Sequence, residues 1–243
     1  MRRCLLSYTG RIGYAEAAAL QDRCARLLRD GGTEERLLLL EHPPVITLGR
    51  NARREDVLQD ERTLRSLGVS VEETNRGGQV TYHGPGQLVG YPILNLSPDR
   101  RDVARYLRDL EEVLIRTLAH FGILAGRVPG LTGVWAGREK IASIGVHLSR
   151  WVTTHGFALN VNTDLSRFGL IVPCGLRGRA VTSMQRLLGR ATPLEDVAAA
   201  LVPEFGEIFG RQMAPEAAGR PEAPAPETAQ GTPPLPPALP EVA

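Results

Sequence analysis

Between Tyr14 and Arg29, apolar residues recur at intervals of three and four, which predicts a helix with one buried face. The apolar stripe consists of Ala17, Leu20, Cys24, Leu27 and Leu28. Gly31 and Gly32 follow and end the pattern. Cys24 lies on the stripe, and Cys4 lies in an expected first strand. Both are therefore interpreted as core residues.

Short apolar runs bounded by Gly and Pro predict the strands. They cover residues 37–40, 45–48, 69–73, 79–82, 87–94, 132–135, 140–148 and 153–161. Further helices are expected at residues 55–67 and 181–188, and from Thr192, which begins a capping-box pattern, to Phe209. Another helix is expected to begin at Ser97-Pro98, with Ser97 as its N-cap, and to end at Phe121. Strands outnumber helices without strict alternation, which indicates an α+β fold.

The C-terminal part of the chain has a different composition from the rest. From Ala214 onward the sequence is mainly Pro, Ala, Glu, Gly and Thr, with no aromatic residue. Such a segment cannot bury enough apolar surface to fold. We expect a single catalytic domain at residues 1–213 and a disordered tail at 214–243.

The overall composition excludes several classes of protein. No apolar run approaches the roughly 20 residues needed to span a bilayer, so a cytoplasmic location is expected. The formal net charge of +2 is too small to indicate nucleic-acid binding. The chain has three widely spaced cysteines and no CxxC pair, which argues against a disulfide framework and against a structural zinc site.

The polar face of the predicted helix after Ser97 is rich in arginine. Arg100, Arg101, Arg105 and Arg108 lie on it. Such a face is typical of a solvated helix surface, and the functional alternative is a docking patch for an acidic partner.

Lysine is almost absent from the chain. The sequence contains 29 Lys and Arg residues, and Lys140 is the single lysine among them. Arg keeps its proton near neutral pH, whereas Lys loses it when its surroundings lower its pKa. Lys140 begins an expected apolar strand, where Ile141 and Ile144 provide desolvation. A strand-end lysine that reaches for solvent is the alternative interpretation.

A glycine-rich stretch at residues 76–87 combines turns with polar side chains. Glycine allows the backbone to approach a ligand closely, and adjacent amide groups can then contact a carbonyl or an anion. An ordinary hairpin with glycine turns is the alternative. The pattern leaves open whether His83 belongs to a site or is a structural histidine. The stretch matches neither a P-loop nor a dinucleotide fingerprint.

Cys174 lies in a Pro-Cys-Gly turn after an apolar run, away from any helical stripe. Turns place side chains at the mouths of sites, and a neighbouring cation increases the thiolate fraction of a cysteine. Cys174 and Lys140 together would form a nucleophile and a base. A buried structural cysteine is the alternative, and spacing alone does not bring the two residues together.

These stretches together resemble the lipoyl(octanoyl) transferases of lipoate biosynthesis. The resemblance covers nearly everything from residue 43 to residue 183. Its motifs are RGGQVTYHGPGQLVGYP at 76–92, GVW at 133–135, KIASIGV at 140–146, HGFALNVNTDL at 155–165 and IVPCG at 171–175. The fold implied is that of the biotin protein ligase and lipoate ligase catalytic domains, a mixed sheet flanked by helices.

The resemblance implies a mechanism and its partners. Cys174 would accept an octanoyl group from octanoyl-acyl carrier protein, and Lys140 would handle the protons. The acceptors would be lysines on lipoyl domains of 2-oxoacid dehydrogenase complexes and on the glycine cleavage H protein. No metal, nucleotide or other cofactor would be needed. The substrate-binding residues implied are Arg76, Gly77, Gly78, Gln79, Val80, Thr81, Tyr82, His83, Ser143, Ile144, Gly145, Gly156, Phe157 and Ala158, with backbone amides among them as oxyanion stabilisers.

Three other functions compete with this interpretation. An adenylating lipoate or biotin ligase of the same fold would activate a free acid with ATP and would need no cysteine. A non-catalytic module that binds carrier proteins would not depend on Cys174. A cysteine hydrolase would release free octanoate instead of transferring it.

Overall fold

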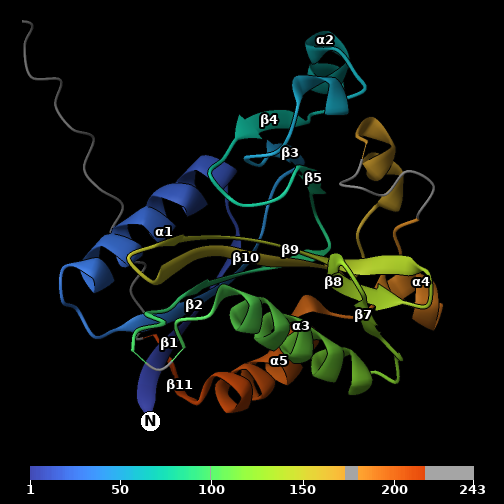
Figure 1. Ribbon diagram of the computed structural model, residues 1–243. Coiled ribbons are helices and arrows are strands. Elements are labelled where there is room, and N and C mark those ends of the chain that lie inside the picture. The colour runs from blue at the N-terminus through green and yellow to red at the C-terminus, as the bar shows by residue number, and fades with distance from the viewer. Residues whose placement is uncertain (99, 173–179, 217–243) are drawn as a thin grey trace, which may run out of the picture.

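A computed structural model describes residues 1–98, 100–172 and 180–216 (Figure 1). The helices are α1 (Tyr14–Arg29), α2 (Glu61–Ser66), α3 (Val103–Ala119), α4 (Met184–Leu188) and α5 (Leu194–Phe209), with 3-10 turns at Arg54–Asp56 and Leu165–Leu170. The strands are β1 (Arg2–Arg11), β2 (Glu35–Glu41), β3 (Val45–Leu48), β4 (Ser70–Glu73), β5 (Val80–His83), β6 (Gln87–Ile93), β7 (Gly126–Val128), β8 (Leu131–Ala136), β9 (Glu139–Ser149), β10 (Val152–Asn160) and β11 (Arg211–Pro215).

The strands form two sheets of unequal size. In the described ranges, the large sheet has the order β11-β1-β2-β6-β10-β9-β8-β7 and mixes parallel with antiparallel pairs. The small sheet has the order β4-β3-β5 and lies on the same side of the large sheet as α1 (Figure 1). The predicted α+β class, with a mixed sheet flanked by helices, is confirmed.

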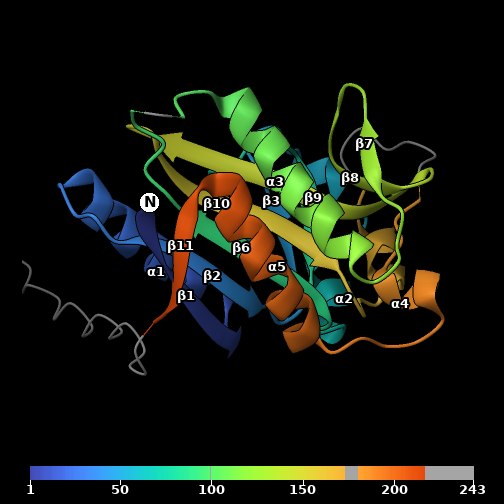
Figure 2. The same ribbon diagram turned by 90° about the horizontal axis from the view of Figure 1, so that it is seen from below.

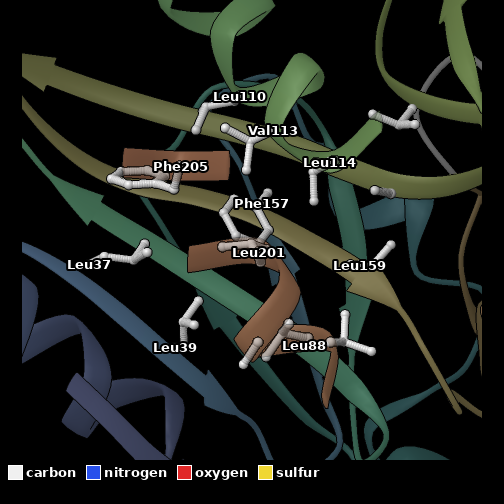
Figure 3. Close-up of a cluster of buried hydrophobic side chains, with 14 of the residues drawn as sticks. Leu37, Leu39, Leu88, Leu110, Val113, Leu114, Phe157, Leu159, Leu201 and Phe205 are labelled. Carbon is white, nitrogen blue, oxygen red and sulfur yellow. The ribbon is translucent and has the colours of Figure 1, made fainter. Parts of the chain in front are cut away.

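Alternation along the central strands divides the core into two layers. On β2, Leu37 and Leu39 point to the side of α3 and α5, whereas Leu38 and Leu40 point to the side of α1. Successive residues of a strand face opposite sides of the sheet, so a run of four leucines supplies both layers. Figure 2, the view from below, shows α3 and α5 side by side in front of the sheet. Leu110 and Leu201 from these helices meet Phe157 of β10 in the larger cluster (Figure 3).

Four of the helix boundaries expected from the sequence differ from the structure. The expected helix at 55–67 is a 3-10 turn followed by the short α2, because Val57 pairs with Ile171 and the Leu58 N–H donates to the Leu170 carbonyl. The helix α2 begins only where the Asp60 carboxylate accepts from the Thr63 N–H. These long-range bonds take precedence over the local helical pattern.

The other differences also arise from competing contacts. Asp102, not Ser97, is the N-cap of α3 and accepts from the Arg105 N–H. Thr192 makes no capping box, because its N–H and carbonyl bind the Asn162 side chain, and Pro193 is the N-cap of α5 instead. The helix α4 starts three residues later than expected because Val181 pairs with Lys140.

Of the four arginines expected on the polar face of this helix, Arg105 and Arg108 lie on α3, whereas Arg100 and Arg101 precede its first residue. Arg101, Arg105 and Arg108 are exposed, as expected of a solvated face, and Arg100 is the exception. Arg100 pairs with Asp109, donates to the Ile208 carbonyl at 2.6 Å and lies over the Phe209 ring. It therefore joins α3 to α5. Arg101 donates to Ser97 Oγ, Arg105 lies 3.9 Å from Asp109, and Arg108 pairs with Glu111.

The described fold extends slightly beyond the expected domain boundary at residue 213. Strand β11 runs through Pro215 and pairs in parallel with β1. Arg211 at its start forms a buried ion pair with Glu35. The rest of the tail, residues 217–243, lies outside the described residues. None of the helices in the described ranges is long and apolar enough to cross a membrane.

We expect Leu201→Ala to lower the free energy of unfolding by about 2–5 kcal/mol, because it opens a cavity in a fully buried layer. Leu124→Ala is the matched control, since Leu124 is 93% exposed, and it should change stability by less than about 0.5 kcal/mol. Urea denaturation measures both. Equal effects of the two substitutions would contradict the assigned core.

Candidate functional site

The pairing of β9 with β10 brings two predicted groups of substrate-binding residues together. Ser143 pairs with Ala158, Ile144 with Phe157 and Gly145 with Gly156. All six line a cavity of about 200 Å³. The two sequence motifs that contain them are joined by the tight turn between β9 and β10, and the antiparallel register places them face to face.

The glycine-rich stretch forms another wall of the same cavity. Arg76, Gly78, Val80, Thr81 and His83 line it. The stretch approaches β9 closely, because the Gly77 N–H donates to the Val146 carbonyl at 2.9 Å. A Cβ on Gly145 would lie 2.9 Å from the Gly77 carbonyl oxygen, so only glycine permits this approach.

Three members of the predicted set do not line the cavity. Tyr82 is buried in the small-sheet cluster, where its ring packs edge-on against Phe168. Gly77 uses its N–H within the fold, so this amide is not available to an oxyanion. Gln79 provides a carbonyl oxygen that accepts from the Gly49 N–H at 3.1 Å.

Arg76 is a buried cation, 7% exposed, at the edge of the cavity. Its Nη2 donates to the Thr47 carbonyl and to Thr47 Oγ1, both at 2.8 Å, and its Nη1 donates to the Gly77 carbonyl at 3.0 Å. These bonds fix the guanidinium in one orientation. Its charge lowers the pKa of His83 and His155, in addition to the larger effect of burial.

Three histidines near the cavity are held in the neutral form. Burial, together with the nearby His42 and Arg76, lowers the pKa of His83 to about 3. His83 donates from Nδ1 to Gln87 Oε1 at 2.8 Å. Burial likewise lowers the pKa of His42 and of His155 to about 4. His83 therefore lies at the site, as a neutral polar group within its wall.

Aromatic residues that the sequence analysis did not select as site residues complete the cavity. Tyr14 and Tyr91 line it together with His155, and the Tyr14 hydroxyl donates to Thr74 Oγ1 at 3.0 Å. The Tyr91 hydroxyl donates to His42 Nε2 at 2.8 Å. Tyr14 begins α1 and Tyr91 lies in the all-buried β6, so both have the sequence signature of ordinary core residues.

Lys140 lies in the wall of the cavity near the start of β9. Its Nζ is 5.5 Å from the centre of the Trp135 ring. The backbone of Lys140 is fixed on both sides: its N–H donates to the Ala180 carbonyl at 3.0 Å, and its carbonyl accepts from the Thr182 N–H at 2.9 Å. The predicted partner, Cys174, lies outside the described residues.

The two other cysteines are core residues, as predicted. Cys4 and Cys24 are both buried, and neither lines the cavity. Burial raises the pKa of the Cys4 thiol to about 12 and also raises that of Cys24. Both thiols are therefore protonated at neutral pH and unsuited to nucleophilic attack.

The cavity can hold an apolar chain with a reactive group beside Lys140. Most of its lining is aliphatic, aromatic or glycine, and Arg76 and Lys140 are the cations among the described lining residues. In the described ranges, no group of three or more His, Cys, Asp or Glu side chains converges as metal ligands would. An acyl group is the kind of ligand that such a lining accommodates.

Comparison with known proteins agrees with this geometry. The family model of the lipoyl protein ligase A/B catalytic domain matches residues 13–206. The chain is 55% identical to the octanoyltransferase of Solibacter usitatus over 217 residues, which cover 89% of this chain and 98% of that protein.

Two solved structures share the fold. One is the bipartite lipoate protein ligase of Thermoplasma acidophilum, with a TM-score of 0.71 and 18% identity over 90% of this chain and 89% of that one. The other is the Aquifex aeolicus biotin protein ligase in complex with biotin and ATP, with a TM-score of 0.53 and 13% identity over 86% of this chain and 71% of that one.

The family match includes the described residues that line the cavity and six of the eight strands of the large sheet, and the similarity to the transferase extends over most of this chain. The chain therefore belongs to the lipoyl protein ligase A/B catalytic domain family.

Proposed function

We propose that this chain transfers an octanoyl group from octanoyl-acyl carrier protein to the ε-amine of a lysine on a lipoyl domain, by way of a thioester on Cys174. The chain is an acyltransferase of protein lipoylation, since relatives about half identical to it over most of its length are octanoyltransferases. The carrier-protein donor, the acceptors named above and the thioester are the parts that this proposal adds.

The observation that carries the proposal is the position of Lys140. Its side chain lines an apolar cavity, and its backbone binds Ala180, the residue that directly follows the segment 173–179. On the other side of that segment, the Val172 N–H donates to the Asp56 carbonyl at 2.7 Å. The described residues on both sides of this segment are thus bound to the fold, and the one that follows it, Ala180, is bound to Lys140 in the cavity wall.

The proposed reaction has two halves. The Cys174 thiolate attacks the thioester carbonyl, a new C–S bond forms, and the bond to the carrier sulfur breaks. The Lys140 ammonium gives its proton to the departing carrier thiolate. The ε-amine of the acceptor lysine then attacks the acyl-enzyme, the amide forms, and the bond to Cys174 breaks. Lys140, now neutral, takes the proton that the amine loses, which restores the starting state.

An adenylating ligase remains the closest competitor, because this family contains ligases and the two activities share the fold. Structural likeness at 18% identity does not separate them. The octanoyltransferases at about 50% identity favour transfer over adenylation. ATP–pyrophosphate exchange dependent on free octanoate or lipoate would count against the proposal.

We expect intact mass spectrometry after incubation with octanoyl-acyl carrier protein to find a mass gain of one octanoyl group, located on Cys174. Cys174→Ser should carry no hydroxylamine-labile thioester, because a serine hydroxyl is a weaker nucleophile than a thiolate and has no sulfur to form that bond. Cys4 and Cys24 are internal controls, because both are buried and should not react with the thioester. An adduct on either of these, or full activity of Cys174→Ala, would rule out the covalent mechanism.

Lys140→Arg should lower the transfer rate by about 10²–10⁴-fold although it keeps the positive charge, because arginine cannot take up the proton of the acceptor amine. Single-turnover measurements should find acyl-enzyme formation less affected than its aminolysis. Arg138→Lys, two residues away on the exposed turn before β9, is the control for local disturbance. Turnover like that of the wild type in Lys140→Arg would refute the base role.

We expect stability to fall as the pH is lowered from 6.5 towards 4. His83 has a folded-state pKa of about 3 against 6.5 in the unfolded chain, so below pH 6.5 the unfolded state binds more protons and gains stability relative to the folded state. Above pH 6.5 both states are neutral and this contribution is complete. Thermal melts across this range measure the slope, and His83→Gln should make it shallower. An unchanged slope in that variant would contradict a buried neutral His83.

A further inference from the structure

Glu111 is a buried carboxylate that the proposed mechanism does not use. It lies on α3, and its side chain is 1% exposed. One of its oxygens, Oε2, accepts from Arg108 Nη1 at 2.8 Å and from Arg127 Nε at 3.0 Å. The other, Oε1, points to the neighbouring strand β8. Burying a carboxylate is costly unless every contact is made, so its position requires an explanation.

The contact of Oε1 is a backbone amide of β8. The Gly133 N–H donates to Glu111 Oε1 at 3.0 Å in a buried position. A bond from a charged acceptor to a main-chain amide is stronger than one between neutral groups. Glu111 therefore fixes the distance between α3 and β8 at Gly133.

Gly133 lies directly against the Lys140 side chain. It has a φ of +119°, a conformation that glycine adopts without strain. A Cβ at this position would lie 2.6 Å from Lys140 Cε and 3.2 Å from Nζ. The space that the missing side chain leaves is thus the space that the end of the lysine occupies. Trp135, two residues further along β8, provides the ring beneath Nζ.

From this chain of contacts we propose that Glu111 is a positioning residue for Lys140, which acts by holding Gly133 at the place where it supports the lysine side chain. The proposal rests on the proposed catalytic role of Lys140. Its consequence is that α3, on the far side of the sheet from the small sheet, sets the position of the proton-transferring amine.

The neighbouring Glu112 provides a matched control. It is one residue further along the same helix and shares Arg127 as a partner, at 2.7 Å, together with Arg116 at 3.2 Å. Its side chain is 33% exposed, and its ion pairs lie at the surface of α3. Loss of a surface ion pair has little effect, so Glu112→Ala should stay within about twofold of the wild-type kcat.

A double-mutant cycle tests the proposal. Glu111→Ala should lower kcat by about 10²-fold, because a displacement of about 1 Å at a reacting group has an effect of this size. In a Lys140→Ala background, the same substitution should lower the residual kcat by less than about threefold, because the group that it positions is already absent. An equal loss in both backgrounds, or no loss in either, would overturn the proposal. Thermal melts confirm that each variant is folded at the assay temperature.

Glu111→Gln tests the same contact if Glu111→Ala does not fold. The amide oxygen of Gln can still accept from the Gly133 N–H, so this variant should keep at least about a third of the wild-type kcat. Gly133→Ala, whose Cβ would lie 2.6 Å from both Lys140 Cε and the Ala142 carbonyl oxygen, should lose activity as Glu111→Ala does. A Gln variant as inactive as Lys140→Ala would contradict positioning through this bond.

The single lysine allows a second measurement that does not depend on activity. Protein labelled with [¹³Cε]lysine, produced without a lysine-containing tag, should give one lysine resonance, from Lys140. This resonance should shift in Glu111→Ala and stay in place in Glu112→Ala.

The two measurements separate the proposals from each other. An active Lys140→Ala would reject the catalytic role of the lysine, whereas the resonance would still decide whether Glu111 positions it. A resonance unchanged in Glu111→Ala would overturn the positioning role even if Lys140 proves catalytic.

Discussion

The site depends on the register between β9 and β10. Side chains alternate between the faces of a sheet. A shift of one residue would therefore turn Phe157 away from the core layer under α3 and α5 and turn Ala158 into that layer. It would also move Gly145, whose lack of a side chain admits the loop at Arg76 and Gly77. The positions of the cavity wall, of Arg76 and of the core layer under α3 and α5 thus depend on one ladder of backbone hydrogen bonds, between β9 and β10.

Burial of polar side chains around this ladder determines which groups in and near the cavity are charged. His83, His42 and His155 are desolvated strongly enough to stay neutral throughout the physiological range. Arg76 keeps its charge, but its guanidinium is held by Thr47. Lys140 is the other cation among the described lining residues, and it is the one to which the proposed mechanism assigns the proton transfers.

Local patterns in the sequence predicted the elements that no distant contact overrides. The helix Tyr14–Arg29 has the bounds that its apolar stripe predicts. The expected helix at 55–67 failed because Val57 pairs with Ile171, a contact between residues far apart in the chain. The capping box at Thr192 failed for the same kind of reason, since Asn162 binds that backbone first.

Site residues that belong to sequence motifs could be predicted, whereas those that reach the site only through packing could not. Lys140 and the residues around Gly145 and Gly156 come from recognisable stretches, and the strand register joins them. The sequence analysis did not select Tyr14, which lines the cavity, because an aromatic residue at the start of a helix looks like any other core residue. Glu111 was equally hidden, since an acidic residue on an arginine-rich helix looks like one half of a surface ion pair.

The scarcity of lysine has a consequence for an enzyme that carries an activated acyl group. Amines capture thioesters, and the proposed acceptor is itself a lysine, whereas guanidinium groups stay protonated and do not compete. All but one of the 29 basic side chains here are arginines, and the remaining one has its backbone bound to Ala180 and Thr182. The surface of the protein is therefore almost inert towards the bond it is proposed to carry, which protects the acyl-enzyme from acylating itself or its neighbours.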